Sequence, residues 1–244
     1  WTTFRLRNAM NWQDWLTARG AHFTDGKLRQ FDDWLREYEW GKSEALVVDS
    51  SHRDRLRMIG DDMLSFLDRL LTYRMTDLPE GAGCRPFLLN SRGRIACTFY
   101  CVHSRKGELL VHGTQGHGDV IMENLDRYHF GEDFSVETVD ENTVLLTVVG
   151  PTATSVLERA GLPCPTEQWT YAQCGADGGW IGRNPRINAN GWDLWLPQAQ
   201  AKEVWTSLEN AGAHVAGNAA LSALRIEAGI PAHPQEFSDA ITPL

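Results

Sequence analysis

The stretch FLLNSRGRIACTFY, residues 87–100, predicts a β-hairpin that is central to the fold. Apolar and β-branched residues lie on both sides of a polar turn, NSRG at 90–93, which is the pattern of a β-hairpin. The second strand offers Cys97, Thr98, Tyr100 and Cys101, and none of these is a carboxylate or an obvious general base. A pocket lined by this hairpin could bind a ligand, with Tyr100 as a candidate contact, but we name no catalytic residue in it.

The composition is that of an ordinary soluble globular protein, with 244 residues of which 42% are hydrophobic and 23% charged. A formal net charge of −9 argues against a surface that neutralises nucleic-acid phosphates. The five cysteines form no C-x-x-C pair, which is typical of a reducing compartment. There is neither an apolar run of membrane-spanning length nor a secretory signal at the N-terminus. We therefore predict a cytoplasmic protein without nucleic-acid or membrane partners.

The pattern of the chain divides it into 1–44, 45–142, 143–231 and a tail at 232–244. The first part is rich in Trp and charge and predicts two helices. In the second helix Phe31, Trp34, Leu35 and Tyr38 fall at i, i+3, i+4 and i+7. This apolar stripe predicts docking on the main body, with partner binding as the alternative. The tail shows no pattern of helix or strand.

The two central parts resemble each other and predict an internal duplication. RMIGDDMLSFLDRLL at 57–71 parallels TVVGPTATSVLERAG at 147–161, and ELLV at 108–111 parallels DLWL at 193–196. Each cycle gives strand, helix, strands and helix, so the fold class we expect is α+β. Two related halves that face each other would leave a cleft between them, which is a usual place for a ligand.

Metal and nucleophilic chemistry find little support in the spacing. On a strand Cys97 and Cys101 would lie about 13 Å apart, too far for zinc–sulfur bonds of about 2.3 Å to one ion. The Gly-rich segment at 113–119 lacks the ending of a P-loop.

Asp193 beside two tryptophans, and Arg225 on an apolar helix, both need partners if they are buried. A pair between these two residues and an anchoring contact with a ligand stay open.

Four stretches in order resemble the folate-binding superfamily of the glycine-cleavage T-protein (GcvT) and YgfZ. They are SHRDRLRMIGDDMLSFLDRLLT (51–72), FLLNSRGRI (87–95), LDRYHFGEDFSVE (125–137) and LRIEAGIP (224–231). The resemblance implies a duplicated α+β domain with tetrahydrofolate, or a folate derivative, in a central cavity.

The resemblance also implies roles for individual residues. The paired aspartates of T-proteins map to Cys97 and Thr98, and neither can act as a carboxylate. The acid that holds the pterin in the family maps to Asp193, and the family's helix arginine maps to Arg225. In the run before that acid, the first arginine of the family maps to Arg183 and its tyrosine to Arg186. The cofactor-binding candidates are thus Asp193, Arg225, Arg186, Arg183 and Tyr100, with no metal ligand among them.

Three hypotheses of function follow from this resemblance. The first is an accessory protein resembling YgfZ that binds tetrahydrofolate and supports maturation or repair of iron–sulfur proteins, its client partners. That branch carries a K-G-C-Y-x-G-Q-E motif and a terminal barrel domain, both expected beyond this sequence; a truncated chain and a short variant would each explain this. The second is a tetrahydrofolate-dependent aminomethyltransferase or demethylase, and the third is a degenerate scaffold or partner-docking relative. The sequence leaves the oligomeric state open.

Overall fold

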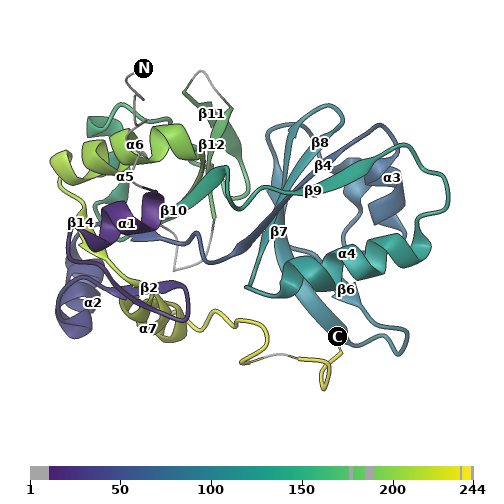
Figure 1. Cartoon of the computed structure of the whole chain (residues 1–244), viewed down its shortest axis with the longest axis horizontal. Helices are drawn as coiled ribbons and strands as arrows, with labels where there is room; N and C mark the ends of the chain where they lie inside the picture. The colour runs from purple at the N-terminus through teal and green to yellow at the C-terminus, as the bar shows by residue number, and fades with distance from the viewer. Residues whose placement is uncertain (1–10, 176–177, 185–189, 237, 243–244) are drawn as a thin grey trace, which may run out of the picture.

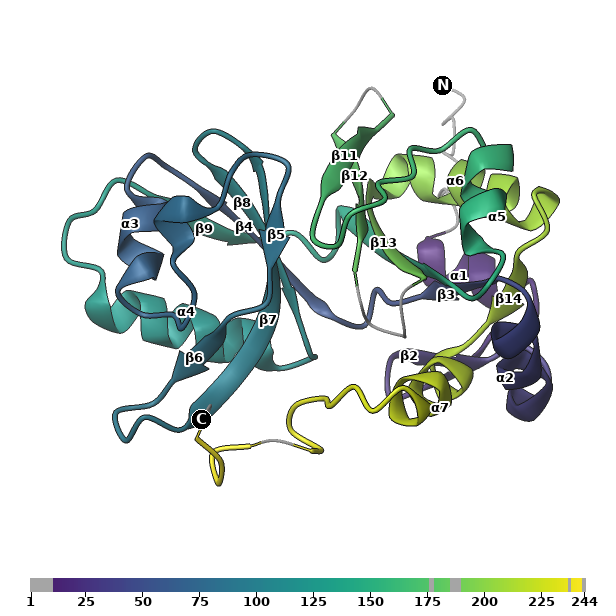
Figure 2. The ribbon, with the colours of Figure 1, turned by 180° about the vertical axis from the view of Figure 1, so that it is seen from behind.

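The computed structural model describes residues 11–175, 178–184, 190–236 and 238–242 and shows two α+β halves side by side (Figures 1 and 2). The sheet of the first half has the order β5-β7-β8-β4-β9, with β6 paired to β7. Its strands are β4 (Asp54–Ile59), β5 (Gly83–Cys84), β6 (Phe87–Leu89), β7 (Ile95–Arg105), β8 (Glu108–Gly113) and β9 (Ser135–Thr138). Helices α3 (Met63–Asp68) and α4 (His117–Tyr128) cover one face, and a short 3₁₀ turn (Met75–Asp77) follows α3. Met58, Phe66 and Phe99 lie in the core between sheet and helices.

The second sheet has the order β11-β12-β13-β10-β3-β14. Its strands are β3 (Leu46–Asp49), β10 (Thr143–Val149), β11 (Tyr171–Cys174), β12 (Gly179–Arg183), β13 (Gly191–Pro197) and β14 (His214–Ala216). Helices α1 (Trp12–Thr17), α5 (Ala153–Arg159) and α6 (Gln198–Asn210) pack against a core that includes Trp192 and Trp205. On the other side α2 (Trp34–Ser43) and α7 (Asn218–Glu227) pack with Leu46 and Val48 of β3.

The strand orders confirm the predicted duplication. The run β5-β7-β8-β4 in the first half matches β11-β12-β13-β10 in the second, and every neighbouring pair in both runs is antiparallel. The glycine that follows β4 and the glycine that follows β10 each allow a close backbone contact at the end of the strand. Gly60 has φ +148° and Gly150 has φ +118°, and a Cβ added there would lie 2.1 Å and 2.0 Å from a backbone oxygen of another segment. Since only glycine tolerates such an approach at positive φ, both strands end at an equivalent point.

One strand departs from the boundaries that the sequence predicts. Residues 46–49 were assigned to the first half, yet β3 pairs with β10 and β14 of the second sheet. Within the described residues the chain therefore crosses between the two sheets twice, at 50–53 from β3 to β4 and at 139–142 from β9 to β10. Between the sheets, Val102, Leu110, Leu145, Tyr171 and Trp195 form an apolar cluster that joins the halves.

The N-terminal part has the two predicted helices and also a hairpin, β1 (His22–Thr24) with β2 (Lys27–Gln30). The predicted apolar stripe is wrong. The Asp33 carboxylate accepts a hydrogen bond from the Leu35 N–H, so α2 begins at Trp34, and Phe31 lies outside it. Trp34 and Leu35 are exposed, whereas Glu37 and Gly41 are buried. The reason is tertiary: a Cβ on Gly41 would lie 2.5 Å from Leu224 Cδ1, so the glycine side of α2 is the one that approaches α7.

The hairpin at 87–100 and the tail behave as the sequence indicates. The Asn90 side chain accepts hydrogen bonds from the backbone N–H groups of Arg92 and Arg94, and Gly93 has φ +71°, which fixes the turn. The described part of the tail has no helix or strand and runs from α7 back to the first half (Figure 1), where the Ile241 carbonyl accepts the Ile95 N–H. In the described parts of the chain, each helix is too short or too polar to cross a membrane.

Candidate ligand-binding cleft

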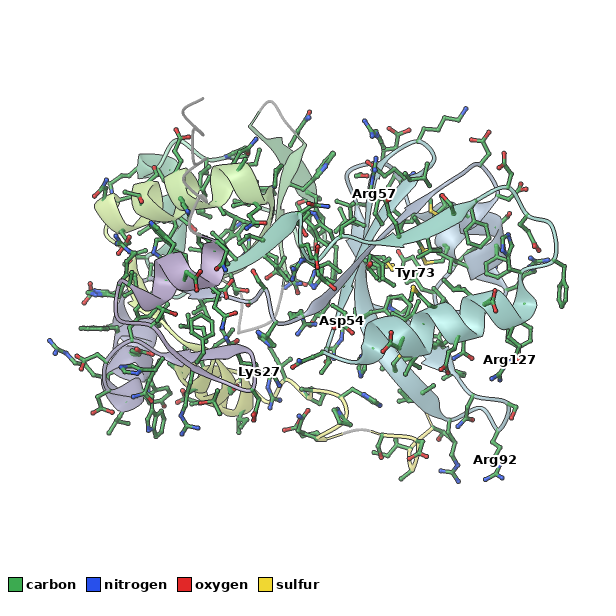
Figure 3. All side chains as sticks on the ribbon, in the orientation of Figure 1. Lys27, Asp54, Arg57, Tyr73, Arg92 and Arg127 are labelled. Atoms are coloured by element: carbon green, nitrogen blue, oxygen red, sulfur yellow. The ribbon has the colours of Figure 1, made fainter. Side chains whose placement is uncertain are left out.

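A cleft of about 360 Å³ lies where both halves and the tail meet. Thr98 and Tyr100 of β7 line it from the first half, and Lys27, labelled in Figure 3, reaches it from β2. The crossover at 52–53, the face of α7 with Arg225, and residues 230–233 and 235, where α7 leads into the tail, complete its wall. Three larger depressions, of about 810 Å³ at α6, about 600 Å³ beside β8 and β13 and about 380 Å³ between α2 and α7, contain none of these residues. The cleft is the place where two candidate residues from the sequence, Tyr100 and Arg225, come together.

Tyr100 is the centre of an aromatic and cationic group. Its ring stacks on the His112 imidazole, with centroids 4.9 Å apart and planes 9° apart. The guanidinium carbons of Arg53 and Arg85 each lie 5.3 Å from the centre of the Tyr100 ring, within cation–π range. Trp169 lies next to the same ring, with centroids 6.0 Å apart. Flat and positively charged groups thus meet on one wall of the cleft.

The alternation of β7 explains which of its side chains reach the cleft. Thr98 and Tyr100 point to one face of the strand, while Cys97, Phe99 and Cys101 point to the other and are buried in the core of the first half. Burial raises the pKa of the Cys97 thiol to about 12, so the thiolate is not formed near neutral pH. The Thr98 hydroxyl donates to the Pro86 carbonyl at 2.9 Å. Neither residue supplies an acid or a nucleophile to the cleft.

The cleft carries positive charge although the chain as a whole is negative. Lys27, Arg53, Arg85 and Arg225 line it, and among the described lining residues there is no carboxylate. Two of the arginines also fasten the tail. Arg225 donates to the Ile230 carbonyl at 2.5 Å and forms an ion pair with Glu236 at 3.0 Å, and Arg85 donates to the Pro231 carbonyl at 3.2 Å. The tail is thereby held as one wall of the cleft.

Two histidines contact each other at the same wall. Nδ1 of His233 lies 2.9 Å from Nε2 of His117, and Nδ1 of His117 lies 3.2 Å from the carbonyl oxygen of Thr98. Burial, with the neighbouring His233, lowers the pKa of His117 from 6.5 to about 4. Burial also lowers the pKa of His233, with Arg85 acting in the same direction and Asp239 against it. Both rings are therefore neutral at pH 7.

Asp193 lies behind the aromatic wall rather than in the cleft. It is buried, accepts the Thr147 hydroxyl at 3.0 Å and the Asn184 amide at 2.6 Å, and has His112 Nε2 3.9 Å away. His112 in turn stacks on Tyr100, so the His112 imidazole lies between Asp193 and the Tyr100 ring that lines the cleft. Asp193 and Arg225 do not pair, since the partners of Arg225 are Glu236 and Ile230. A direct ligand contact of Asp193 stays a prediction, and it would require the ligand to displace one of these partners.

The two remaining candidates lie elsewhere. Arg183, at the end of β12, donates to the Thr166 carbonyl, and its guanidinium carbon lies 5.6 Å from the centre of the Trp192 ring. Arg186 lies outside the described residues. Trp192 is buried in the core of the second half, and its indole N–H donates to the Pro165 carbonyl at 3.1 Å. Among the described cofactor-binding candidates that the resemblance implies, Arg225 is the one that lines the cleft.

Sequence reasoning missed much of the wall: Arg53, Arg85, His112, His117 and His233. Arg53 lies in the crossover directly before β4, outside the helices and strands. His112 directly precedes the Gly-rich segment at 113–119, His117 lies inside that segment, and His233 lies in the tail, where the sequence shows no pattern of helix or strand. The usable signal was position: Arg53 comes directly before β4, Arg85 directly after β5, and His112 lies near the end of β8. Across the parts of the chain that the structure describes, there is no group of three or more metal-ligating side chains.

The duplicated α+β fold places a cleft of small-molecule size where two related halves meet. The family model of the GCVT N-terminal domain matches residues 8–244, so the chain belongs to this GcvT-like family. An aminomethyltransferase of Rubrobacter xylanophilus is 29% identical over 236 residues, which cover 94% of this chain and 63% of the relative. One of Cutibacterium acnes is 25% identical over 243 residues, covering 92% and 66%. The chain thus spans about two thirds or less of the length of these curated relatives.

Solved structures agree on the fold. The glycine cleavage system aminomethyltransferase T of Bartonella henselae superimposes with a TM-score of 0.85 at 24% identity, covering 94% of this chain and 65% of that one. A heterotetrameric sarcosine oxidase of Corynebacterium sp. U-96 gives a TM-score of 0.52 at 12% identity, covering 72% and 89%. These likenesses confirm the predicted α+β, GcvT-like fold. They do not select the YgfZ-type branch, which remains a hypothesis.

Proposed function

We propose that this chain binds tetrahydrofolate, or a folate derivative, in the cleft and forms the folate-binding part of a one-carbon transferase of the aminomethyltransferase type. The observation that carries the proposal is the Tyr100 wall, where an aromatic ring, a stacked imidazole and two guanidinium groups converge. A folate combines a flat bicyclic ring with a carboxylate tail. Aromatic rings and guanidinium planes suit the flat ring, and Lys27, Arg53, Arg85 and Arg225 suit the carboxylates.

Size and charge agree with this ligand class. A volume of about 360 Å³ lies within the range of small-molecule sites. The positive lining contrasts with the net charge of −9, so the charge is concentrated where an anionic tail would bind. The names of the relatives support the transferase over the accessory role, which was the leading hypothesis from the sequence.

Calorimetric titration with tetrahydrofolate under anaerobic conditions tests the binding. We expect saturable one-to-one binding by the parent and at least about 10-fold weaker binding by Tyr100→Leu, because the variant removes the stacking surface and both cation–π contacts. Tyr73→Leu is the matched control, since Tyr73 is an exposed tyrosine of the first half outside the cleft lining (Figure 3). Absence of binding by the parent, or equal binding by Tyr100→Leu, would refute the proposal.

A second candidate function is the accessory role in iron–sulfur protein maturation. The observation that favours it is that neither residue at the positions of the family's paired aspartates offers an acid. Cys97 is a core thiol whose pKa burial raises to about 12, and the Thr98 hydroxyl donates a hydrogen bond to the Pro86 carbonyl. The described lining of the cleft contains no carboxylate. Aminomethyl or methyl turnover by the parent chain, followed as loss of free tetrahydrofolate, would favour the transferase. Folate binding without turnover, together with lower activity of iron–sulfur enzymes in cells that lack the protein, would favour the accessory role.

A further inference from the structure

Lys27 brings to the cleft a positive charge that no carboxylate of the described residues balances by an ion pair. It lies in β2, where strand alternation places the neighbouring Leu28 in the core of the second half and Lys27 at the cleft. Arg225, by contrast, forms an ion pair with Glu236 and donates to the Ile230 carbonyl. Within the described residues the Lys27 ammonium group also makes no hydrogen bond, so it is available to an anion in the cleft.

The side-chain amide of Asn218 is held in one orientation beside Lys27. Asn218 is the first residue of α7, and its Nδ2 donates to the carbonyls of Leu28 and Asp49, both at 2.9 Å. Carbonyl oxygens can only accept, so these contacts use both N–H bonds of the amide and fix which edge carries the oxygen. Asn218 lines the cleft, and its Oδ1 accepts no hydrogen bond from the described residues. The cleft therefore has a fixed oxygen acceptor next to a free ammonium donor.

The face of α7 that carries Asn218 runs along the cleft. Asn218, Leu221, Ser222 and Arg225 fall at i, i+3, i+4 and i+7, so they share one side of the helix, and all four line the cleft. Polar groups thus continue from Asn218 over about two helical turns. An extended part of a ligand can lie along this face.

These groups belong to the second half, whereas the aromatic wall belongs to the first. β2 and α7 lie side by side (Figures 1 and 2), and the hydrogen bond from Asn218 to the Leu28 carbonyl joins them. Tyr100 lines the cleft from β7, with the guanidinium groups of Arg53 and Arg85 over its ring. A ligand that fills the cleft therefore meets an aromatic surface from one half and the donor and acceptor of Lys27 and Asn218 from the other.

We propose that Lys27 and Asn218 form the subsite for the acidic tail of the ligand, with the Lys27 ammonium group on a carboxylate and Asn218 Oδ1 accepting the hydrogen of the neighbouring amide N–H. The inference rests on the proposed function for the identity of the ligand and adds an orientation: the flat ring lies against Tyr100, and the tail lies along α7. In the p-aminobenzoyl-glutamate tail of a folate, the amide N–H and a carboxylate are attached to the same carbon. An ammonium donor beside a fixed oxygen acceptor complements this pair of groups.

A purely structural role is the alternative for Asn218, because its two hydrogen bonds tie α7 to β2 and β3. Replacement of Asn218 could weaken binding through the fold alone. The test therefore changes the ligand as well as the protein, so that each contact is measured as a preference between two ligands by the same variant.

Anaerobic calorimetry with tetrahydrofolate and with its glutamate diamide, which has a neutral tail, tests Lys27. We expect the parent to bind the diamide about 3- to 10-fold more weakly, the effect of one partly exposed charged contact. Lys27→Met should lose most of this preference. Lys106→Met, between β7 and β8 and outside the cleft lining, is the matched control and should keep it. An unchanged preference in Lys27→Met would overturn the role of Lys27.

An analogue in which an ester oxygen replaces the amide N–H of the tail tests Asn218. The parent should bind this ester about 3- to 10-fold more weakly than tetrahydrofolate, the effect of one hydrogen bond. Asn218→Leu should bind the two ligands alike, even where its affinity for both is lower. An equal preference in the parent and in Asn218→Leu would show that Asn218 acts through the fold and would overturn its role in the subsite.

The failures of the inference and of the proposed function differ in this experiment. If the parent binds no tetrahydrofolate, the proposed function is refuted and the subsite is refuted with it. If the parent binds tetrahydrofolate but distinguishes it from neither analogue, the inference alone is refuted, because the tail then lies away from Lys27 and Asn218.

Discussion

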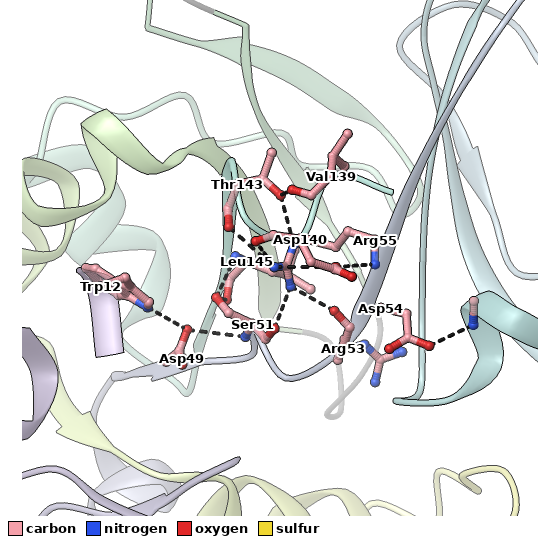
Figure 4. Close-up of polar contacts among 11 residues, drawn as sticks. Trp12, Asp49, Ser51, Arg53, Asp54, Arg55, Val139, Asp140, Thr143 and Leu145 are labelled. Atoms are coloured by element: carbon pink, nitrogen blue, oxygen red, sulfur yellow. Dashed lines mark hydrogen bonds and ion pairs between the residues drawn. The ribbon is translucent and has the colours of Figure 1, made fainter. Parts of the chain in front are cut away.

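Arg55 offers the sharpest test of how the two halves are held together (Figure 4). Its side chain is only 2% exposed, and it donates to the Ser51 and Arg53 carbonyls at 2.6 and 2.7 Å, and to the Asp140 carbonyl and Thr143 hydroxyl at 2.8 and 2.9 Å. The first two acceptors lie in the crossover from β3 to β4, the third lies in the crossover from β9 to β10, and Thr143 is the first residue of β10. The guanidinium group of Arg55 therefore joins the two crossovers between the sheets through hydrogen bonds.

Arg55→Met keeps the length of the side chain and removes every donor. Buried acceptors lose their partners, and removal of one partner from a buried charged network costs about 3–5 kcal/mol. In a protein of this size that corresponds to a decrease in Tm of about 6–20 °C. Urea-induced unfolding with linear extrapolation, together with a thermal scan, measures both quantities.

Arg57→Met is the matched control, two residues further along β4. The Arg57 side chain is 33% exposed and pairs with Glu108 and Glu137, and Glu108 keeps Arg105 as a partner after the change. We expect a loss of about 1 kcal/mol or less for this partly exposed pair. If the two variants lose the same free energy of unfolding, to within about 0.5 kcal/mol, the argument that Arg55 joins the crossings is refuted.

Three further predictions concern single buried polar groups. Because the pKa of His117 falls from 6.5 to about 4 on folding, the unfolded chain takes up this proton first, so the parent should lose stability as the pH decreases from 6.5 to about 4. Urea unfolding at pH 7.5 and 4.5 should show a smaller loss for His117→Gln, and equal losses would contradict this. Glu37 accepts three backbone N–H groups, one of them from Gly217, so Glu37→Gln turns an amide toward a donor and should cost about 1–3 kcal/mol in the same assay; an unchanged midpoint would count against it. Asp193→Ala should bind tetrahydrofolate at least about 10-fold more weakly if the carboxylate anchors the ring, and unchanged affinity in calorimetry would remove Asp193 from the site.

The local features of the fold could be predicted from the sequence. The hairpin at 87–100 follows from turn chemistry within four residues, and the duplication follows from glycines that end equivalent strands. The two features that the sequence predicted wrongly depend on contacts between residues far apart in the chain. The buried side of α2 is decided by the approach of Leu224 to Gly41, and β3 joins the second sheet because β10 and β14 pair with it.

The candidate site divides in the same way. Tyr100 could be selected because strand alternation places it opposite the buried Cys97, Phe99 and Cys101. Arg225 came from the resemblance to the family, and its position at the cleft agrees with that source. His233 carries no local signal, because its partner His117 lies 116 positions away and the tail between α7 and the C-terminus has no periodic pattern. The contact between His233 and His117 can be recognised only from the structure, in which the tail packs against the first half.

The same placement links the stability of the fold to the chemistry of the cleft. Arg53 contributes its guanidinium to the Tyr100 wall, and its carbonyl is held by Arg55 at the crossing of the two halves. Arg85 and Arg225, from opposite halves, fasten the tail that carries His233. Because Arg85 of the first half and Arg225 of the second half both hold the segment that leads to His233, the relative position of the halves affects the distance between the Tyr100 wall and His233. A variant that loosens the crossing at Arg55 should therefore weaken ligand binding even where the lining side chains are unchanged.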